Sequence, residues 1–243
     1  MQPIGTQVDP RPGSAEEAPE RLARLPRGLY VLTPETDDDE WLVAAVTAAV
    51  RGGASAVQYR SKELGAAERL RQARTLREAC RRLNVTFIVN DSPELARDLK
   101  ADGVHLGRDD ADPAAVRTFL GAETIIGLSC YDSFERALET RDTADYCAFG
   151  SVFPSQVKPT AVKAPLGLFG EARKAGLHAV AIGGIDAGNA GRVAAAGADA
   201  VAVITSVFGE PGLPCDSGTI EANARSISEA FEAGSGQPVS NAT

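Results

Sequence analysis

One short stretch decides the fold: Ala198-Asp199-Ala200-Val201, which leads from a segment of helical spacing into an apolar run. Related stretches stand at Ala101-Asp102-Gly103-Val104 and at Ala144-Asp145-Tyr146-Cys147. In each of them the chain passes through a small residue and an aspartate into residues typical of a buried strand. This recurrence predicts that the chain is an internal repeat of strand and helix.

Eight apolar runs alternate with eight segments of helical spacing. Strands are predicted over residues 28–33, 54–60, 85–90, 102–107, 124–129, 145–150, 178–183 and 198–205. Helices are predicted over residues 38–52, 65–83, 92–100, 112–120, 132–142, 166–175, 187–196 and 218–232, several with proline just inside the start or glycine just past the end. Strands that alternate with helices pair in parallel through right-handed crossovers, so eight units predict an α/β fold, the closed (β/α)8 TIM barrel.

The same alternation also suits an open, doubly wound sheet, which stays an alternative at this point. The first strand is not followed by GxGxxG, which weighs against a dinucleotide-binding fold. We therefore predict a single barrel domain over residues 27–233. Residues 1–26 and 234–243 are rich in proline, glycine and polar residues without a sustained period, which predicts a flexible leader and a flexible tail.

The charge of the chain narrows the classes of partner. A formal net charge of -8 at pH 7 argues against nucleic acid and anionic membranes, since both bind basic surfaces. Neither a membrane-spanning apolar run nor a signal-peptide pattern is present. The four cysteines show no CxxC pair or zinc-ligand spacing and indicate reduced thiols. We expect a soluble, cytoplasmic protein that binds small molecules; a homo-oligomer is allowed by the sequence but not required.

The first candidate binding residues follow the apolar residues 54–57. Side chains two apart in an extended strand share a face, so Gln58, Arg60 and Lys62 should point the same way. In a parallel barrel the active site lies at the C-terminal ends of the strands, where these residues stand. They form a candidate anion grip, although two cations alone more often belong to a solvated edge with surface ion pairs.

Two acids are candidate metal ligands. Asp91 follows the third predicted strand and Asp110 lies in the loop after the fourth, so the two could share one cation. Mg²⁺ held by one or two carboxylates and by substrate phosphate oxygens is the usual arrangement. Taken singly, Asp91 also suits a helix cap before Pro93, and Asp110 suits a solvated turn. The pair, opposite several cations, favours the metal site.

A second candidate anion site lies at the ends of the last two strands. Gly183 and Gly184 close one strand and Thr205 the other, and barrels commonly bind phosphate at these loops. A tight turn would require glycine whatever the ligand. Two anion sites suggest two phosphorylated substrates. Of the two histidines, His105 is a weak candidate near the rim, whereas His178 is typical of a core residue.

Short motifs stand in a fixed order at the ends of strands two to eight. They are Gln58-Tyr59-Arg60-Ser61-Lys62, Val89-Asn90-Asp91, Gly103-Val104-His105-Leu106-Gly107 with Asp110, Gly127-Leu128-Ser129, Lys158-Pro159 and Ala181-Ile182-Gly183-Gly184-Ile185. Together they resemble the thiamine-phosphate synthase family over residues 28–208. The resemblance implies a transferase that joins hydroxymethylpyrimidine diphosphate to thiazole monophosphate with Mg²⁺, giving thiamine phosphate and pyrophosphate.

The resemblance also implies roles for the matching residues. The diphosphate would be bound by Arg60, Lys62, Asn90, Ser129 and Lys158, with Ser155 as a further substrate contact; among these, Arg60, Lys62, Ser129 and Lys158 would be catalytic. Asp91 and Asp110 would hold Mg²⁺, and Gln58 would face the pyrimidine. The thiazole phosphate would be bound by Gly184, Ile204 and Thr205.

The implied chemistry needs no strong base. An electron-rich aminopyrimidine supports a methylene cation as pyrophosphate leaves, so the reaction is dissociative and catalysis is charge neutralisation and positioning. Four residues depart from the usual family pattern: Arg108, Tyr131, Ser151 and Val157. Two alternatives stay open: a thiazole tautomerase-like isomerase of the same fold, and a non-catalytic sensor of phosphorylated ligands, which the Val157 and Arg108 departures allow.

Overall fold

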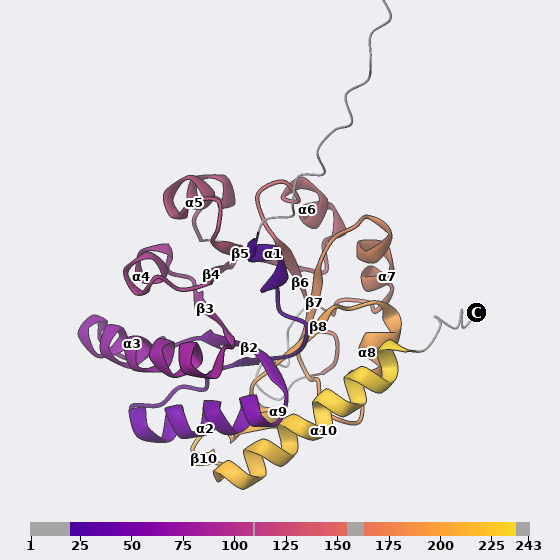
Figure 1. Cartoon of the computed structure of the whole chain (residues 1–243). Coiled ribbons are helices and arrows are strands. Elements are labelled where there is room, and N and C mark those ends of the chain that lie inside the picture. The colour runs from indigo at the N-terminus through magenta and orange to yellow at the C-terminus, as the bar shows by residue number, and fades with distance from the viewer. Residues whose placement is uncertain (1–19, 109, 155–162, 237–243) are drawn as a thin grey trace, which may run out of the picture.

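The eight predicted strands form one closed parallel barrel in chain order (Figure 1). The computed structural model describes residues 20–108, 110–154 and 163–236. The strands are β1 (Gly28–Leu32), β2 (Ala54–Tyr59), β3 (Thr86–Asn90), β4 (Gly103–Leu106), β5 (Ile125–Tyr131), β6 (Tyr146–Gly150), β7 (Ala179–Ile182) and β8 (Ala200–Val203). Pairing of β1 with β8 closes the barrel. The fold predicted from the sequence is confirmed.

Helices surround the barrel and connect its strands (Figure 1). Those that match the predicted segments are α2 (Asp39–Arg51), α3 (Ala66–Leu83), α4 (Pro93–Leu99), α5 (Pro113–Leu120), α6 (Phe134–Glu139), α7 (Gly167–Lys174), α8 (Ala190–Ala196) and α10 (Ser217–Ser235). Local capping fixes several of their starts. Asp38 accepts the amide of Trp41 at the start of α2, and Ser133 accepts that of Arg136 at the start of α6.

Four short elements were not predicted. α1 (Glu20–Ala23) precedes the barrel, α9 (Thr205–Phe208) follows β8, and β9 (Gly209–Glu210) pairs antiparallel with β10 (Leu213–Pro214). The eighth strand was expected to run through Thr205, but it ends at Val203. The reason is local, because the amides of Val207 and Phe208 both donate to the carbonyl oxygen of Ile204 and start α9 there.

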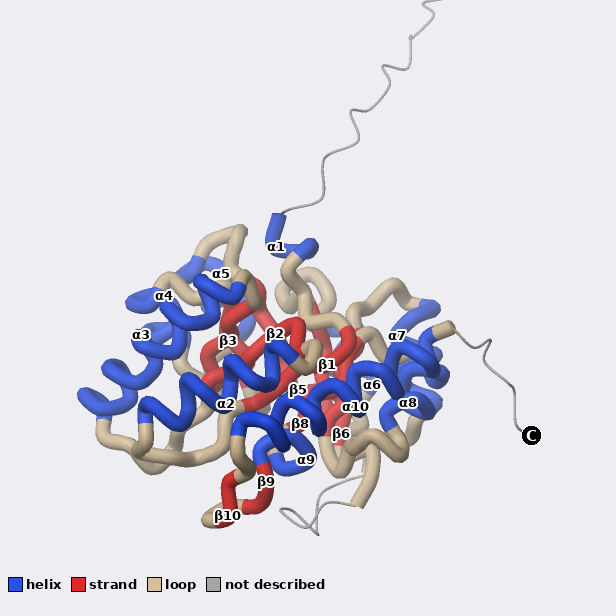
Figure 2. The backbone as a smooth tube through the Cα atoms, turned by 60° about the horizontal axis from the view of Figure 1, so that its bottom comes forward, coloured by secondary structure: helices blue, strands red, loops and turns tan. Residues whose placement is uncertain are grey.

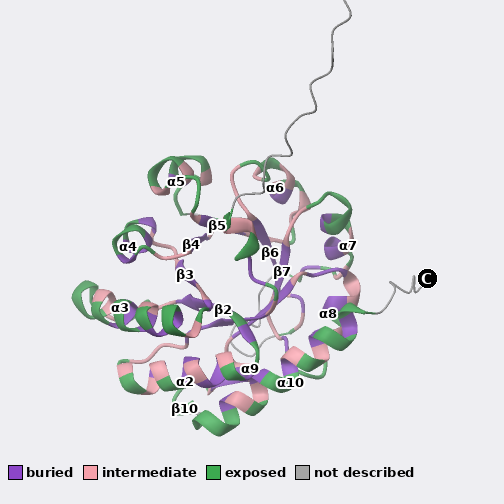
Figure 3. Ribbon diagram, in the orientation of Figure 1, coloured by how far each residue is buried: buried purple, intermediate pink, exposed green. Residues whose placement is uncertain are grey.

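The core has two layers, one on each side of the strands. Figure 3 shows that the barrel strands are mostly buried. Outward-facing residues such as Val57 and Phe87 pack under the helices, and inward-facing residues such as Tyr30 and Ile88 fill the barrel. This division follows from the period of two along a strand. Burial of one large apolar side chain contributes roughly 1.5–3 kcal/mol, so both layers stabilise the barrel. The packed interior leaves the strand ends as the place for a site.

Residues 20–27 cover the N-terminal end of the barrel, and Figure 2 shows α1 at the end opposite to β9 and β10. Leu22 and Leu25 pack on the interior core. Three arginines spaced three apart each reach the aspartate of one repeated junction: Arg21–Asp145 at 2.8 Å, Arg24–Asp102 at 2.6 Å and Arg27–Asp199 at 3.5 Å. Residues 20–26, the end of the predicted leader, therefore contact the barrel.

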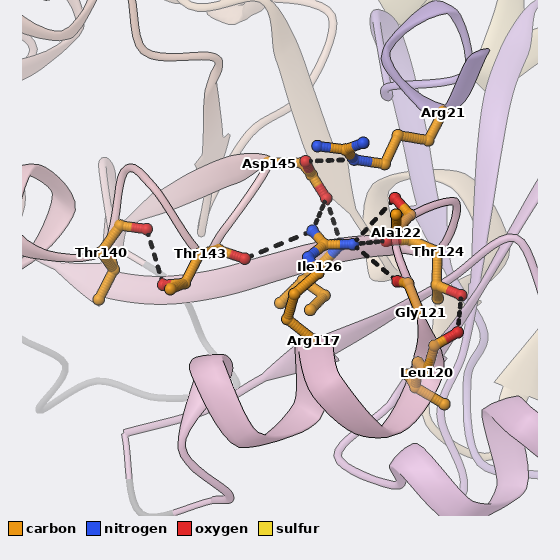
Figure 4. Close-up of polar contacts among 10 residues, drawn as sticks. All are labelled: Arg21, Arg117, Leu120, Gly121, Ala122, Thr124, Ile126, Thr140, Thr143 and Asp145. Carbon is orange, nitrogen blue, oxygen red and sulfur yellow. Dashed lines mark hydrogen bonds and ion pairs between the residues drawn. The ribbon is translucent and has the colours of Figure 1, made fainter. Parts of the chain in front are cut away.

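The aspartates of the repeated junctions also tie neighbouring strands together. Asp145 accepts the backbone amide of Ile126 on the preceding strand at 2.8 Å and pairs with both Arg21 and Arg117 (Figure 4). The same amide contact recurs from Phe87 to Asp102 and from Ala179 to Asp199. The repeated junctions recognised in the sequence thus supply aspartates that link neighbouring strands at the N-terminal end of the barrel.

Candidate active site

The candidate binding residues in and after β2 lie in two different places, inside the barrel and on its rim. Gln58 lies inside the barrel, 3% exposed, where its Nε2 donates a hydrogen bond to the Tyr30 hydroxyl at 2.8 Å. β2 ends at Tyr59, so Arg60 and Lys62 lie beyond the strand, and its alternation no longer sets the direction of their side chains. Acidic side chains from neighbouring loops hold these two residues on the rim instead.

Glu35, which the sequence analysis did not single out, is the first of these acids. Its Oε1 accepts from Arg60 Nη1 at 3.0 Å, and both carboxylate oxygens accept the backbone amide of Lys62 at 3.0 Å. Thr33 fixes the same turn, since its hydroxyl accepts the Arg60 amide at 2.9 Å and donates to the Arg60 carbonyl at 3.1 Å. The polar residues directly after the first strand were the signal that could have identified both.

The carboxyl groups of Asp91 and Asp110 are neighbours on the same rim. Burial, and then the adjacent carboxyl of Asp110, raise the pKa of Asp91. Lys62 Nζ lies 3.5 Å from Asp91 Oδ2. No cluster of three or more potential metal-ligating His, Cys, Asp or Glu side chains occurs among the described residues. Two adjacent carboxylates nevertheless fit Mg²⁺, because substrate oxygens and water supply the remaining ligands in such sites.

The helix-cap alternative for Asp91 is wrong. Ser92 caps α4, since its hydroxyl accepts the amide of Leu95 at 3.3 Å. Asp91 has a backbone φ of 61°, a left-handed conformation that is uncommon outside glycine and that clusters at functional sites. Asp110 accepts the amide of Gly107 at 2.6 Å, so it stabilises a turn and can still offer its other oxygen to a ligand.

A hydrogen-bonded chain crosses the barrel interior beneath this rim. His105 Nε2 lies 2.9 Å from Ser129 Oγ, and His105 Nδ1 lies 3.0 Å from the Tyr146 hydroxyl. That hydroxyl lies 3.1 Å from the Tyr30 hydroxyl, which accepts from Gln58. Burial lowers the pKa of His105 to about 4, so the ring is neutral near pH 7. Ser129 and Gln58 are therefore connected, through one weak candidate and two tyrosines that the sequence analysis did not single out.

The glycines after β7 are required by the backbone. Gly183 and Gly184 have φ values of 100° and 65°, and a Cβ atom on Gly184 would lie 2.5 Å from the carbonyl oxygen of Pro154. After the neighbouring strand β8, Thr205 opens α9 with Ile204 before it. The turn explains the glycines by itself, and phosphate binding by these residues stays a prediction.

The remaining candidates stand as follows. Asn90 is the last residue of β3 and pairs in register with His105. Ser155 and Lys158, together with Val157, lie outside the described residues. Two departures from the family pattern contact each other, since the Arg108 guanidinium lies 4.4 Å from the centre of the Tyr131 ring. Such a cation–π contact stabilises an exposed pair by about 0.5–1 kcal/mol, so these two residues form a unit.

Fold and site define the class of protein: a (β/α)8-barrel enzyme whose rim holds cations, paired carboxylates and glycine turns. The family model described as thiamine monophosphate synthase matches residues 29–207, and the chain belongs to this family. A thiamine-phosphate synthase of Chromobacterium violaceum is 56% identical over 182 residues, which cover 74% of this chain and 88% of that relative. One from Bordetella pertussis is 49% identical over 219 residues, which cover 87% and 98%.

A solved structure agrees with these sequence relatives. The thiamine phosphate pyrophosphorylase from Pyrococcus furiosus superimposes with a TM-score of 0.73 at 32% identity, covering 87% of this chain and 98% of that chain. The family resemblance drawn from the ordered motifs is confirmed.

Proposed function

We propose that this enzyme is a transferase that joins hydroxymethylpyrimidine diphosphate to thiazole monophosphate and releases pyrophosphate, giving thiamine phosphate. The observation that carries the proposal is the cluster of Lys62, Asp91 and Asp110 on one rim, with Arg60 joined to Lys62 through Glu35. A thiazole tautomerase or a sensor of a monophosphate needs no such diphosphate grip. Membership of the family supports the same reaction.

Mg²⁺ is the proposed cofactor, with Asp91 and Asp110 as its protein ligands. The neighbouring carboxyl groups support this assignment, because a divalent cation would relieve their mutual repulsion. When bound, the ion supplies charge stabilisation to the departing pyrophosphate.

The chain's own residues would bind, orient and neutralise. Arg60, Lys62 and the loop residue Lys158 bind the diphosphate more tightly as charge develops on it, which lowers the barrier to bond cleavage. Asn90 and Ser129 add hydrogen bonds to the same group, with Ser155 as a further contact. Gln58 orients the pyrimidine, and the thiazole phosphate is bound by Gly184, Ile204 and Thr205.

The proposal extends to a cytoplasmic location and to small phosphorylated molecules as partners. The four cysteines are free thiols, which suits a reducing compartment. Among the described helices, none is long and apolar enough to cross a membrane.

The test is thiamine phosphate formation from both substrates, with Mg²⁺ and after chelation. We expect product only when both substrates and the metal are present. Lys158→Ala should lower kcat/KM on the order of a hundredfold, because it removes a charge-assisted contact to the leaving group. Val157→Thr should raise kcat/KM only several-fold, by about one ordinary hydrogen bond. Binding of thiazole phosphate without product would indicate a sensor, and its isomerisation alone would indicate a tautomerase.

A further inference from the structure

Five side chains form an unbroken row of hydrogen bonds inside the barrel, which we call the interior chain. Its members, in order, are Gln58, Tyr30, Tyr146, His105 and Ser129, with successive distances of 2.8, 3.1, 3.0 and 2.9 Å. The rings of His105 and Tyr146 are also stacked, with centroids 5.6 Å apart. The two ends of this row are substrate residues from β2 and β5, so its hydrogen-bond directions bear on both parts of the site.

The direction of each hydrogen bond depends on that of its neighbours. Each tyrosine hydroxyl has one hydrogen to donate, and a neutral imidazole has one N–H and one acceptor nitrogen. Because Gln58 Nε2 can only donate, the Tyr30 oxygen accepts, and Tyr30 can pass its own hydrogen to Tyr146. Tyr146 then donates to His105 Nδ1, which leaves the ring proton on Nε2, facing Ser129.

The opposite direction would remove the hydrogen that the substrate needs. With the ring proton on Nδ1, the Nε2 atom of His105 would accept the only hydrogen of the Ser129 hydroxyl. The hydroxyl could then offer an anionic diphosphate nothing but oxygen lone pairs. The Tyr30 hydroxyl hydrogen would then find an acceptor in this row only if the Gln58 amide turned over to present Oε1.

We propose that His105 is a positioning residue, fixed as the Nε2–H tautomer by the interior chain, and that it thereby leaves the Ser129 hydrogen free for the diphosphate and holds the Gln58 amide in one orientation. Gln58 keeps one N–H and its Oε1 for the pyrimidine, a donor and an acceptor side by side, which matches the ring nitrogen and amino group of an aminopyrimidine. The identity of the two ligands rests on the proposed function. The direction of the chain follows from the placement of Gln58 Nε2 against the Tyr30 hydroxyl, together with the requirement that each buried hydroxyl hydrogen has an acceptor.

The tautomer is measured directly by long-range ¹H–¹⁵N correlation of the imidazole rings in untagged, ¹⁵N-labelled protein. The chain contains two histidines, and His178→Asn assigns the other signal set to His105. His178 is an internal reference, because its Nε2 lies 2.7 Å from the carbonyl oxygen of Pro26 and must carry a proton to bond it. We expect the Nε2–H pattern for His105. An Nδ1–H pattern or a charged ring at pH 7.5 would overturn the proposal.

Tyr146→Phe interrupts the interior chain with little change of volume. We expect the His105 signals of this variant to become those of a tautomer mixture. The KM for the pyrimidine diphosphate should rise about fivefold to tenfold, as expected for one or two ordinary hydrogen bonds, while the KM for the thiazole phosphate stays unchanged. The matched control is Tyr59→Phe, which removes a buried hydroxyl that donates to Gln72 Oε1 at 3.0 Å outside the barrel interior. This control should change neither KM nor the tautomer.

The two proposals fail in different ways. An unchanged single tautomer in Tyr146→Phe, or equal changes in both KM values, would refute the positioning role of the interior chain even if thiamine phosphate is formed. An Nε2–H tautomer that becomes mixed in Tyr146→Phe, in a protein that forms no thiamine phosphate, would support the interior chain and refute the proposed reaction.

Discussion

The two ends of the barrel use the same side chain, aspartate, in opposite ways. At the N-terminal end, Asp145 is 5% exposed and is satisfied by two arginines and a backbone amide. At the C-terminal end, Asp91 is 35% exposed, pairs with Lys62 and adjoins another acid that raises its pKa. In the first arrangement the carboxylate is fully paired within the protein, which contributes stability. The second keeps like charges together, and such a pair is stabilised when a cation binds.

The largest effect is expected from breaking the closed end. Asp145→Ala should lower the free energy of unfolding by about 3–5 kcal/mol, because it leaves Arg21 and Arg117 without their carboxylate and the Ile126 amide without its acceptor. Urea denaturation measures the change. Asp142→Ala is the control, since Asp142 is 90% exposed, and should change stability by less than about 0.5 kcal/mol. Similar losses of unfolding free energy in both variants would show that the ion pairs and hydrogen bond of Asp145 add no stability beyond that of an exposed aspartate.

The open end should show the reverse pattern. Asp91→Asn should lower kcat/KM on the order of a hundredfold, equivalent to about 2.7 kcal/mol of transition-state stabilisation. The free energy of unfolding should stay constant or rise, because the substitution removes one of two adjacent acids. Asp98→Asn, at an exposed position of α4, should leave both quantities unchanged. A destabilised but fully active Asp91→Asn would place this residue with the structural aspartates.

Glu35 sharpens the comparison, because it is an ion-paired acid at the open end. Glu35→Ala should lower kcat/KM about tenfold through a higher KM for the pyrimidine diphosphate, since Arg60 and the Lys62 backbone lose the contact that orients them. The exposed Glu63→Ala should have no effect on KM. A lower KM in Glu35→Ala would mean instead that the carboxylate competes with the diphosphate for Arg60.

The smallest effect is expected from a single exposed arginine at the closed end. Arg24 is 52% exposed, and Asp102 keeps Arg77 as a second partner at 3.3 Å. Arg24→Ala should therefore cost about 0.5–1 kcal/mol of unfolding free energy, with kcat/KM unchanged. Thermal unfolding at low and at high salt provides the measurement, and the difference between variant and parent should shrink at high salt. A loss as large as that of Asp145→Ala would identify residues 20–27 as essential to the barrel.

Most of the architecture was predictable because its signals are local. The eight alternating segments were recognised because the period of a strand or a helix depends only on residues that are close together in the sequence. The junction aspartates marked the repeat. The family was recognised from a resemblance, because the ordered short motifs at the strand ends match its pattern. α9 was missed because β8 and this helix share one apolar run, and only the hydrogen bonds at Ile204 divide them.

The contacts that join distant segments were not predictable. Arg21 and Asp145 stand 124 positions apart, and the arginines lie in a segment without any hydrophobic period. Tyr30 and Tyr146 stand 116 positions apart, and each by itself is an ordinary apolar strand residue. Glu35 follows a proline in a short loop and differs from a solvent-exposed acid only through Arg60 and Lys62.

The sequence by itself determined that this chain is a (β/α)8 barrel and which residues close its strands, because both follow from periodicity and from the order of short motifs. The tertiary structure alone decided which charged side chains are paired within the protein and which remain available to a ligand. It also decided how Gln58 and Ser129 are connected through His105. The physical reason is that ion pairs and hydrogen bonds depend on distances of a few ångströms between segments, and closure of the barrel sets those distances.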